Sequence, residues 1–137
     1  MNKINLLLLL ACGGLFSCKN ASSPPKNEAN TSENAAFICE DLGNDAQDVP
    51  RHRLLLQVAG VKTLVDTVIT CTEIPKTEYK DKEIPANALA ACGGWYAGGG
   101  DYFYAIEQAG KVVIFKGWQE EGQEDMSFHW TLLAPTK

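Results

Sequence analysis

Short stretches of apolar and β-branched residues follow one another along the chain after residue 36, and their spacing predicts strands. Segments 51–58 (RHRLLLQV) and 61–70 (VKTLVDTVIT) are rich in Leu, Val, Ile and Thr, and they flank the dipeptide Ala59-Gly60. Two such runs around a short glycine-containing turn predict a β-hairpin. The same reasoning predicts four more strands: a short first one at 37–40, a second hairpin over 102–107 and 111–118 with its turn at 108–110, and a last one at 127–133.

Both faces of the predicted strands carry apolar side chains. Val112 and Ile114 point to one side of segment 111–118, whereas Val113 and Phe115 point to the other. A sheet with one face in water would alternate apolar and polar residues. We therefore expect other parts of the chain to cover the sheet on both sides.

Segment 86–92 (ANALAAC) is the candidate helix. It follows Pro85, which is favoured in the first helical turn, and it precedes Gly93, which can end a helix. Together these patterns predict a mainly β domain. It would be a small antiparallel β-meander that closes as a barrel or packs as a sandwich, with one short helix near 86–92.

Glycines and aromatic residues are concentrated in segment 91–104 (ACGGWYAGGGDYFY). Phosphate-binding glycine loops run from a strand into a helix, whereas this segment is predicted to run from a helix into a strand. We interpret it as a loop that leads into the strand at Tyr102, with Trp95 and Tyr96 covering the open end of the core. The functional alternative is that its rings bind a sugar or a peptide; those rings would be Trp95, Tyr96, Tyr102 and Tyr104.

The first 18 residues (MNKINLLLLLACGGLFSC) have the pattern of an export signal. Lys3 precedes an apolar run over residues 4–16 that is too short to span a membrane. The run ends on LFSC, with Leu15 three positions before Cys18 and the small Ser17 directly before it. This ending resembles the lipobox of bacterial lipoproteins, although Phe16 departs from the small or aliphatic residue that is usual there.

The resemblance implies that residues 1–17 are a signal peptide that is removed and that Cys18 is lipidated, for example with palmitate. Two or more acyl chains anchor a protein stably, because each buried methylene contributes roughly 0.8 kcal/mol. The chain would then face the periplasm or the cell surface from a bacterial membrane of the cell envelope. A second match that ends at Cys12 and an ordinary secretory signal are the alternatives.

The chain after the signal divides into a tether and a domain. Residues 18–35 comprise Cys18 and a polar stretch with too few apolar residues to form a core, so we expect a flexible tether. Residues 36–137 remain for a single small β domain. The whole chain has a net charge of −5 and no basic stretch, so nucleic acid is excluded as a partner.

Three cysteines, Cys39, Cys71 and Cys92, lie in the domain. In an oxidising compartment two of them are expected to form a disulfide and one is left over. Cys39–Cys71 is the favoured pair, because Cys92 lies among apolar residues where a free thiol is commonly buried. The alternative pair is Cys71–Cys92.

An acidic segment at 118–130 is the candidate metal site. Carboxylates around Gly122 could supply oxygen ligands for a weakly bound calcium ion, although the ligand spacing of an EF-hand is absent. Segment 40–48 (EDLGNDAQD) fails the same spacing test. The calcium candidates are Glu120, Glu121, Glu124 and Asp125.

The histidines do not point to catalysis or to zinc. His52 and His129 lie in predicted strands, far in sequence from Cys92, and show no zinc-binding spacing. No catalytic residue and no cofactor is therefore assigned.

The sequence thus predicts a membrane-anchored cell-envelope lipoprotein that acts as a non-enzymatic binding or accessory module rather than as an enzyme. Its partner would be an envelope protein, a glycan or a cell-wall component. The alternative is a small envelope hydrolase that uses acidic residues, with or without a divalent ion. The candidate ligand-binding residues are Trp95, Tyr96, Tyr102 and Trp118.

Overall fold

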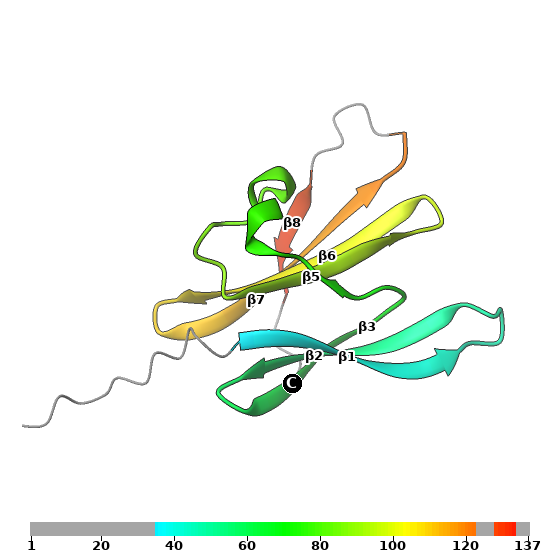
Figure 1. Ribbon diagram of the computed structural model, residues 1–137, viewed down its shortest axis with the longest axis horizontal. Coiled ribbons are helices and arrows are strands. Elements are labelled where there is room, and N and C mark those ends of the chain that lie inside the picture. Colours follow the sequence, from blue (N-terminus) through cyan, green and yellow to red (C-terminus); the bar gives the residue numbers. More distant parts are fainter. Residues whose placement is uncertain (1–34, 123–127, 134–137) are drawn as a thin grey trace, which may run out of the picture.

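The computed structural model describes residues 35–122 and 128–133, which form two antiparallel sheets (Figure 1). Within each sheet the strands lie in sequence order. The three-stranded sheet contains β1 (Ala35–Asn44), β2 (Pro50–Val58) and β3 (Val61–Val68). The five-stranded sheet contains β4 (Thr72–Glu73), β5 (Ala90–Tyr96), β6 (Gly99–Gln108), β7 (Lys111–Glu120) and β8 (His129–Leu132). The mainly β, antiparallel fold is confirmed, and no closed barrel is formed by the described residues.

Three hairpins share one turn chemistry. The two-residue turns are Ala-Gly dipeptides, and both residues of each turn have positive φ, as a type I′ turn requires. The hairpin at β2–β3 and the hairpin at β6–β7 were predicted and are confirmed. The turns and their φ values are Ala59-Gly60 (49° and 82°), Ala97-Gly98 (47° and 87°) and Ala109-Gly110 (49° and 73°).

The predicted helix at 86–92 is wrong. Residues 90–92 belong to β5, where Ala90 pairs with Ala105 and Ala91 pairs with Tyr104. Pro85 begins a single turn, in which the N–H of Ala88 donates to the Pro85 carbonyl at 2.9 Å. Pairing with β6 thus overrides the high intrinsic helix propensity of the alanines, because propensity is small relative to tertiary pairing. The helical turns of this region are 3₁₀ and lie earlier in the chain, at η2 (Lys76–Glu78) and η3 (Lys80–Lys82).

The glycine-rich segment is therefore a hairpin rather than a loop between a helix and a strand, and its glycines make room for rings. A Cβ added to Gly93 would lie 2.6 Å from Cδ1 of Tyr102, and one added to Gly100 would lie 2.7 Å from Cε2 of the same ring. Likewise, a Cβ on Gly117 would lie 2.7 Å from the indole of Trp130. The glycines let these two rings lie flat on the sheet.

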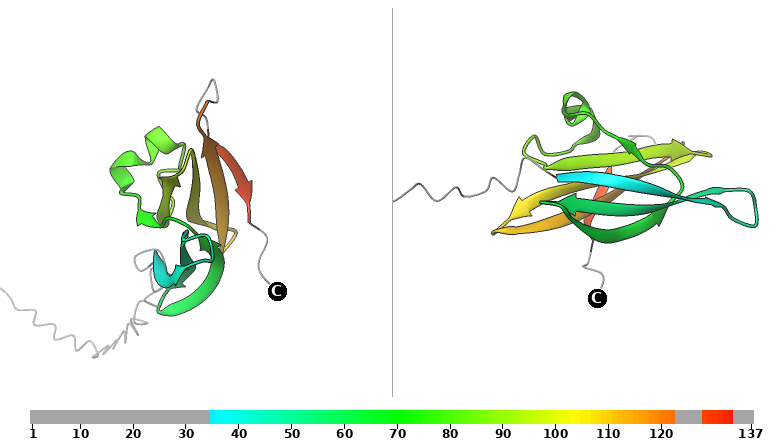
Figure 2. Two further views of the ribbon diagram at one scale, coloured as in Figure 1. Left: turned by 90° about the vertical axis from the view of Figure 1, so that its right-hand side faces the viewer. Right: turned by 60° about the horizontal axis from the view of Figure 1, so that its bottom comes forward.

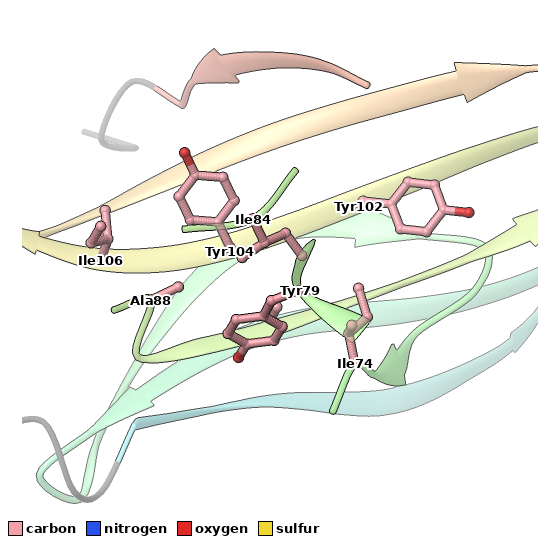
Figure 3. Packing of buried hydrophobic residues seen from close by; sticks show 8 residues of the cluster. Ile74, Tyr79, Ile84, Ala88, Tyr102, Tyr104 and Ile106 are labelled. Atoms are coloured by element: carbon pink, nitrogen blue, oxygen red, sulfur yellow. The ribbon is translucent and has the colours of Figure 1, made fainter. Parts of the chain in front are cut away.

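The five-stranded sheet is covered on both faces, as expected from its apolar pattern. On one face, the segment between β4 and β5 packs onto the rings of β6 (Figures 1 and 3). The ring of Tyr104 stacks on Phe115 at 4.9 Å between centroids and meets Trp130 edge-on at 4.7 Å. The buried residues of this cluster are Ile74, Tyr79, Ile84, Ala88, Ala91, Tyr102, Tyr104 and Ile106.

The other face of the five-stranded sheet packs against the three-stranded sheet, which comes forward in the right-hand view of Figure 2. Phe103 and Leu54 are completely buried there. Lys116 of β7 also joins the sheets, because its Nζ lies 2.9 Å from Oδ2 of Asp66 in β3. The buried residues of this second cluster are Leu54, Leu56, Val65, Val68, Cys92, Phe103 and Ala105.

A disulfide also connects the two parts of the domain. Cys39 of β1 and Cys71, directly before β4, lie at bonding distance with their Cα atoms 6.1 Å apart. This is the pair that the sequence favoured over Cys71–Cys92. Cys92 is free and buried between the sheets.

Candidate functional site

A cavity of about 330 Å³ lies at the end of the five-stranded sheet where the β5–β6 turn is found. Among the described residues, two aromatic and two acidic side chains line it: Tyr96 of β5, Asp101 of β6, and Trp118 and Glu120 of β7. We call it the aromatic–acidic cavity. Its other lining residues come from β5 to β7 and from Ile69 and Thr70, which directly follow β3.

The strand register explains why these four side chains share one cavity. Residues directly opposite each other on neighbouring strands point to the same face of a sheet. One row across the sheet reads Gly94, Asp101, Trp118, and the next row reads Tyr96, Gly99, Glu120. Thr70 fills the space above Gly94, where an added Cβ would lie 2.8 Å from its Oγ1. Gly99 leaves room beside Tyr96, because a Cβ there would meet only the carbonyl oxygen of Gln119 at 3.7 Å.

Of the four aromatic residues predicted to bind a ligand, the structure brings two to this cavity. Tyr96 is 40% exposed and Trp118 is 38% exposed. Trp95 is 41% exposed but does not line the cavity, because successive residues of a strand point to opposite faces. Tyr102 is buried in the core, where its ring covers Gly93 and Gly100.

Asp101 is the lining residue that sequence reasoning missed as a site residue. It lies opposite Trp118, and its Oδ2 is 3.9 Å from the Nζ of Lys116, the lysine that also pairs with Asp66. The ring of Trp118 packs against His129 at 5.0 Å between centroids. Lys116 therefore places a positive charge next to Asp101, and His129 places a second ring next to Trp118. Asp101 could have been found from its position two residues before Phe103, because residues two apart in a strand point to the same face. That inference requires knowing that β6 begins at Gly99.

The predicted calcium ligands are described only in part. Glu120 lines the aromatic–acidic cavity, and the N–H of Glu121 donates to the carbonyl of Gly98 at 2.9 Å. Glu124 and Asp125 lie outside the described residues. Across residues 35–122 and 128–133, no group of three or more His, Cys, Asp or Glu side chains could hold a metal ion. A calcium site at this turn stays a prediction.

The acidic segment at 40–48 uses its carboxylates to build the β1–β2 turn. Asp45 accepts hydrogen bonds from the N–H groups of Gln47 and Val49, at 2.9 and 3.0 Å, and forms an ion pair with Arg51 at 3.1 Å. The hydrogen bond from Val49 is the largest cause that lowers the pKa of Asp45 below its ordinary value, and Gln47 and Arg51 add to it. These contacts give Asp45 a structural role.

The free thiol of Cys92 is buried, and the rings of His52 and His129 each contact another residue. Burial raises the pKa of Cys92 to about 12, so the thiol stays protonated near neutral pH and is a poor nucleophile. Nδ1 of His52 lies 3.0 Å from the carbonyl oxygen of Ile69, and His129 packs on Trp118. His52 thus has a backbone hydrogen-bonding partner, and His129 has a ring-packing partner.

Comparison with known proteins adds no relative: no family model, no curated protein and no solved structure matches this chain. Cys18, the predicted lipidation site, lies outside the described residues. In the described part of the chain, no helix has the length and apolar character needed to cross a membrane.

Proposed function

We propose that this protein is a lipid-anchored binding module of a bacterial cell envelope, whose two sheets pack as a sandwich and whose aromatic–acidic cavity binds a glycan. The observation that carries the proposal is the convergence of Tyr96, Trp118, Asp101 and Glu120 on one cavity. Its volume of about 330 Å³ lies within the range of small-ligand sites. Envelope localisation is inferred from the sequence pattern that ends at Cys18.

The chemistry of the cavity suits a sugar ring. Tyr and Trp side chains offer flat apolar faces together with a polar group, and carboxylates accept hydrogen bonds from hydroxyl groups. The two carboxylates would repel an anionic ligand, so a neutral or amino sugar of the cell wall fits better than a phosphorylated one. The β5–β6 turn, beside this cavity, lies at the opposite end of the domain from the start of β1, where the tether would enter (Figure 1). A domain anchored in this way would present the cavity away from the membrane.

The test is thermal unfolding of the chain from residue 18, with Cys18→Ser to prevent acylation, against neutral oligosaccharides and cell-wall fragments. This chain retains both hydrophobic clusters and the disulfide, which lie between Phe37 and Leu133. A glycan present at one hundred times its Kd stabilises the folded state by about 2.7 kcal/mol, which raises Tm by several degrees. No shift with any glycan would refute the proposal.

Trp95 provides a matched control. Trp118→Ala and Trp95→Ala each remove one half-exposed indole, but only Trp118 lines the cavity. We expect Trp118→Ala to abolish the ligand-dependent shift and Trp95→Ala to preserve it. Equal losses in the two variants would place binding elsewhere on the domain.

The alternative function is a small hydrolase, and the observation that favours it is that Asp101 and Glu120 line the same cavity. Paired carboxylates are the catalytic groups of most glycoside hydrolases. If the domain is a hydrolase, an oligosaccharide that shifts Tm is also cleaved, and Glu120→Gln abolishes cleavage while retaining binding. Binding without cleavage would refute the hydrolase and favour the proposed binding module.

A further inference from the structure

A second cavity, of about 480 Å³, lies between the edge of the three-stranded sheet and strands β7 and β8. Twelve of the described residues line it; ten of them are apolar, and the two others are Thr63 and Lys111. Val61, Leu64 and Leu132 line it although they are 67%, 48% and 59% exposed. Three of the most exposed large apolar side chains of the described residues therefore gather around one hollow.

Lys111 distinguishes this cavity from a plain apolar patch. It directly follows the Ala109-Gly110 turn, it is exposed, and it forms no ion pair with any other residue of the described chain. Among residues 35–122 and 128–133, no carboxylate lines the cavity. A single positive charge beside an apolar hollow complements a ligand with an apolar chain and an anionic head group.

The cavity lies at the other end of the domain from the aromatic–acidic cavity. Val58 and Lys111, which flank two of the hairpin turns, both line it, and Val58 is paired with Ala35 at the start of β1. Figure 1 shows the start of β1 and the β2–β3 and β6–β7 turns together at one end, with the β5–β6 turn at the other. None of the described residues lines both cavities, so each can be tested without the other.

From these observations we propose that the second cavity binds a single-chain amphiphile with a carboxylate head, a free fatty acid. The acyl chain lies among Val58, Leu64 and Ile114, and the carboxylate pairs with Nζ of Lys111 at the rim. The volume lies in the range of small-ligand cavities. Membrane lipid and a second copy of the chain are the other possible occupants of an apolar surface, and the test separates them.

The experiment is calorimetric titration of the Cys18→Ser chain from residue 18 with decanoate, dodecanoate and tetradecanoate, below their micelle concentrations. Each buried methylene adds about 0.8 kcal/mol, so affinity is expected to rise about fourfold per methylene until the cavity is full. Lys111→Gln should weaken dodecanoate binding by about two- to fivefold, the range of an exposed ion pair, and leave dodecanol binding unchanged. Affinity that is independent of chain length would overturn the proposal.

Two exposed positions supply variants that keep the core intact. Val61→Glu and Leu132→Glu each place a carboxylate beside the hollow and should lower dodecanoate affinity at least tenfold. Leu42→Glu is the matched control, because Leu42 is 47% exposed and does not line the cavity. An equal effect of Leu42→Glu would overturn the assignment.

The remaining outcomes also decide the question. Sedimentation with phosphatidylglycerol vesicles in the absence of dodecanoate binding would assign the surface to the membrane. A dimer that Leu132→Glu dissociates, again without dodecanoate binding, would assign it to a second copy of the chain. Either result would refute the fatty-acid site.

Discussion

Three glycines of the β5–β6 hairpin should respond very differently to the same added methyl group. A Cβ on Gly93 would lie 2.5 Å from the carbonyl oxygen of Asp101 and 2.8 Å from Cα of Tyr102, so it meets the backbone of the neighbouring strand. Its φ of 154° adds strain for any other residue. Overpacking costs about 1–3 kcal/mol and such backbone strain costs a similar amount, so we expect Gly93→Ala to lower the free energy of unfolding by about 3–5 kcal/mol.

Substitutions at the two other glycines should have much smaller effects on stability. Gly98, in the turn, has a φ of 87° but open space around it, with Oε2 of Glu121 at 3.5 Å as the nearest atom, so Gly98→Ala should cost only about 1 kcal/mol. A Cβ on Gly99 would meet only the carbonyl oxygen of Gln119, at an ordinary 3.7 Å. Gly99→Ala should be neutral or stabilise by about 0.5 kcal/mol, because glycine is unfavourable inside a strand.

Thermal unfolding followed by circular dichroism measures this order directly. At roughly 4–8 °C per kcal/mol for a domain of this size, Gly93→Ala should lower Tm by about 15–30 °C and Gly98→Ala by about 5 °C. The reasoning fails if Gly93→Ala melts within 5 °C of the parent chain, or if Gly99→Ala is as damaging as Gly93→Ala. Gly99 also lines the aromatic–acidic cavity, so Gly99→Ala should weaken glycan binding while preserving Tm.

Three further outcomes are expected from single contacts. Cys92 should resist iodoacetamide at pH 8 in the native chain and react on unfolding in urea, because burial raises the pKa of its thiol to about 12; rapid native alkylation would contradict its placement. The lowered pKa of Asp45 means that its stabilisation of the β1–β2 turn is present above about pH 4 and lost as the pH falls through the folded-state value, so the protection factor of the Val49 amide against exchange should fall there; in Asp45→Asn it should not change over the same pH range. Ala59→Asn should raise the free energy of unfolding by about 0.5–1 kcal/mol, because Asn tolerates the positive φ of a type I′ turn better than Ala; unchanged denaturant midpoints would argue against that turn.

Strand positions were predictable where local pattern and turn chemistry agree. Segments 51–58 and 61–70 carry β-branched and aliphatic runs on either side of Ala59-Gly60, and the structure forms that hairpin. The covering of both sheet faces also followed from the opposed pairs of apolar residues in segment 111–118. Both features are determined by residues that are close in sequence, so a single sequence is enough to predict them.

The β5–β6 hairpin was not predictable in the same way. Ala90 and Ala91 have low strand propensity and become part of a strand by pairing with β6. The missed role of Asp101 follows from this error, because the cavity depends on the register between β5, β6 and β7. Sequence alone identified Tyr96 and Trp118 as candidates. It could not separate them from Trp95 and Tyr102, because the face to which each side chain points depends on where the strands begin.

The consecutive order of strands in each sheet has a consequence for how the chain reaches this structure. Every strand pairs with a neighbour in sequence, so both sheets can assemble through short-range contacts, which favours rapid folding. Distant segments meet where the two sheets pack together, in the cluster that includes Leu54, Val68 and Phe103. A chain threaded through a membrane from its N-terminus would complete the three-stranded sheet first, and that sheet would expose its apolar face until β6 emerged. In a chain exported in this way, the interval before docking would be the period of greatest vulnerability to aggregation and to formation of the wrong disulfide.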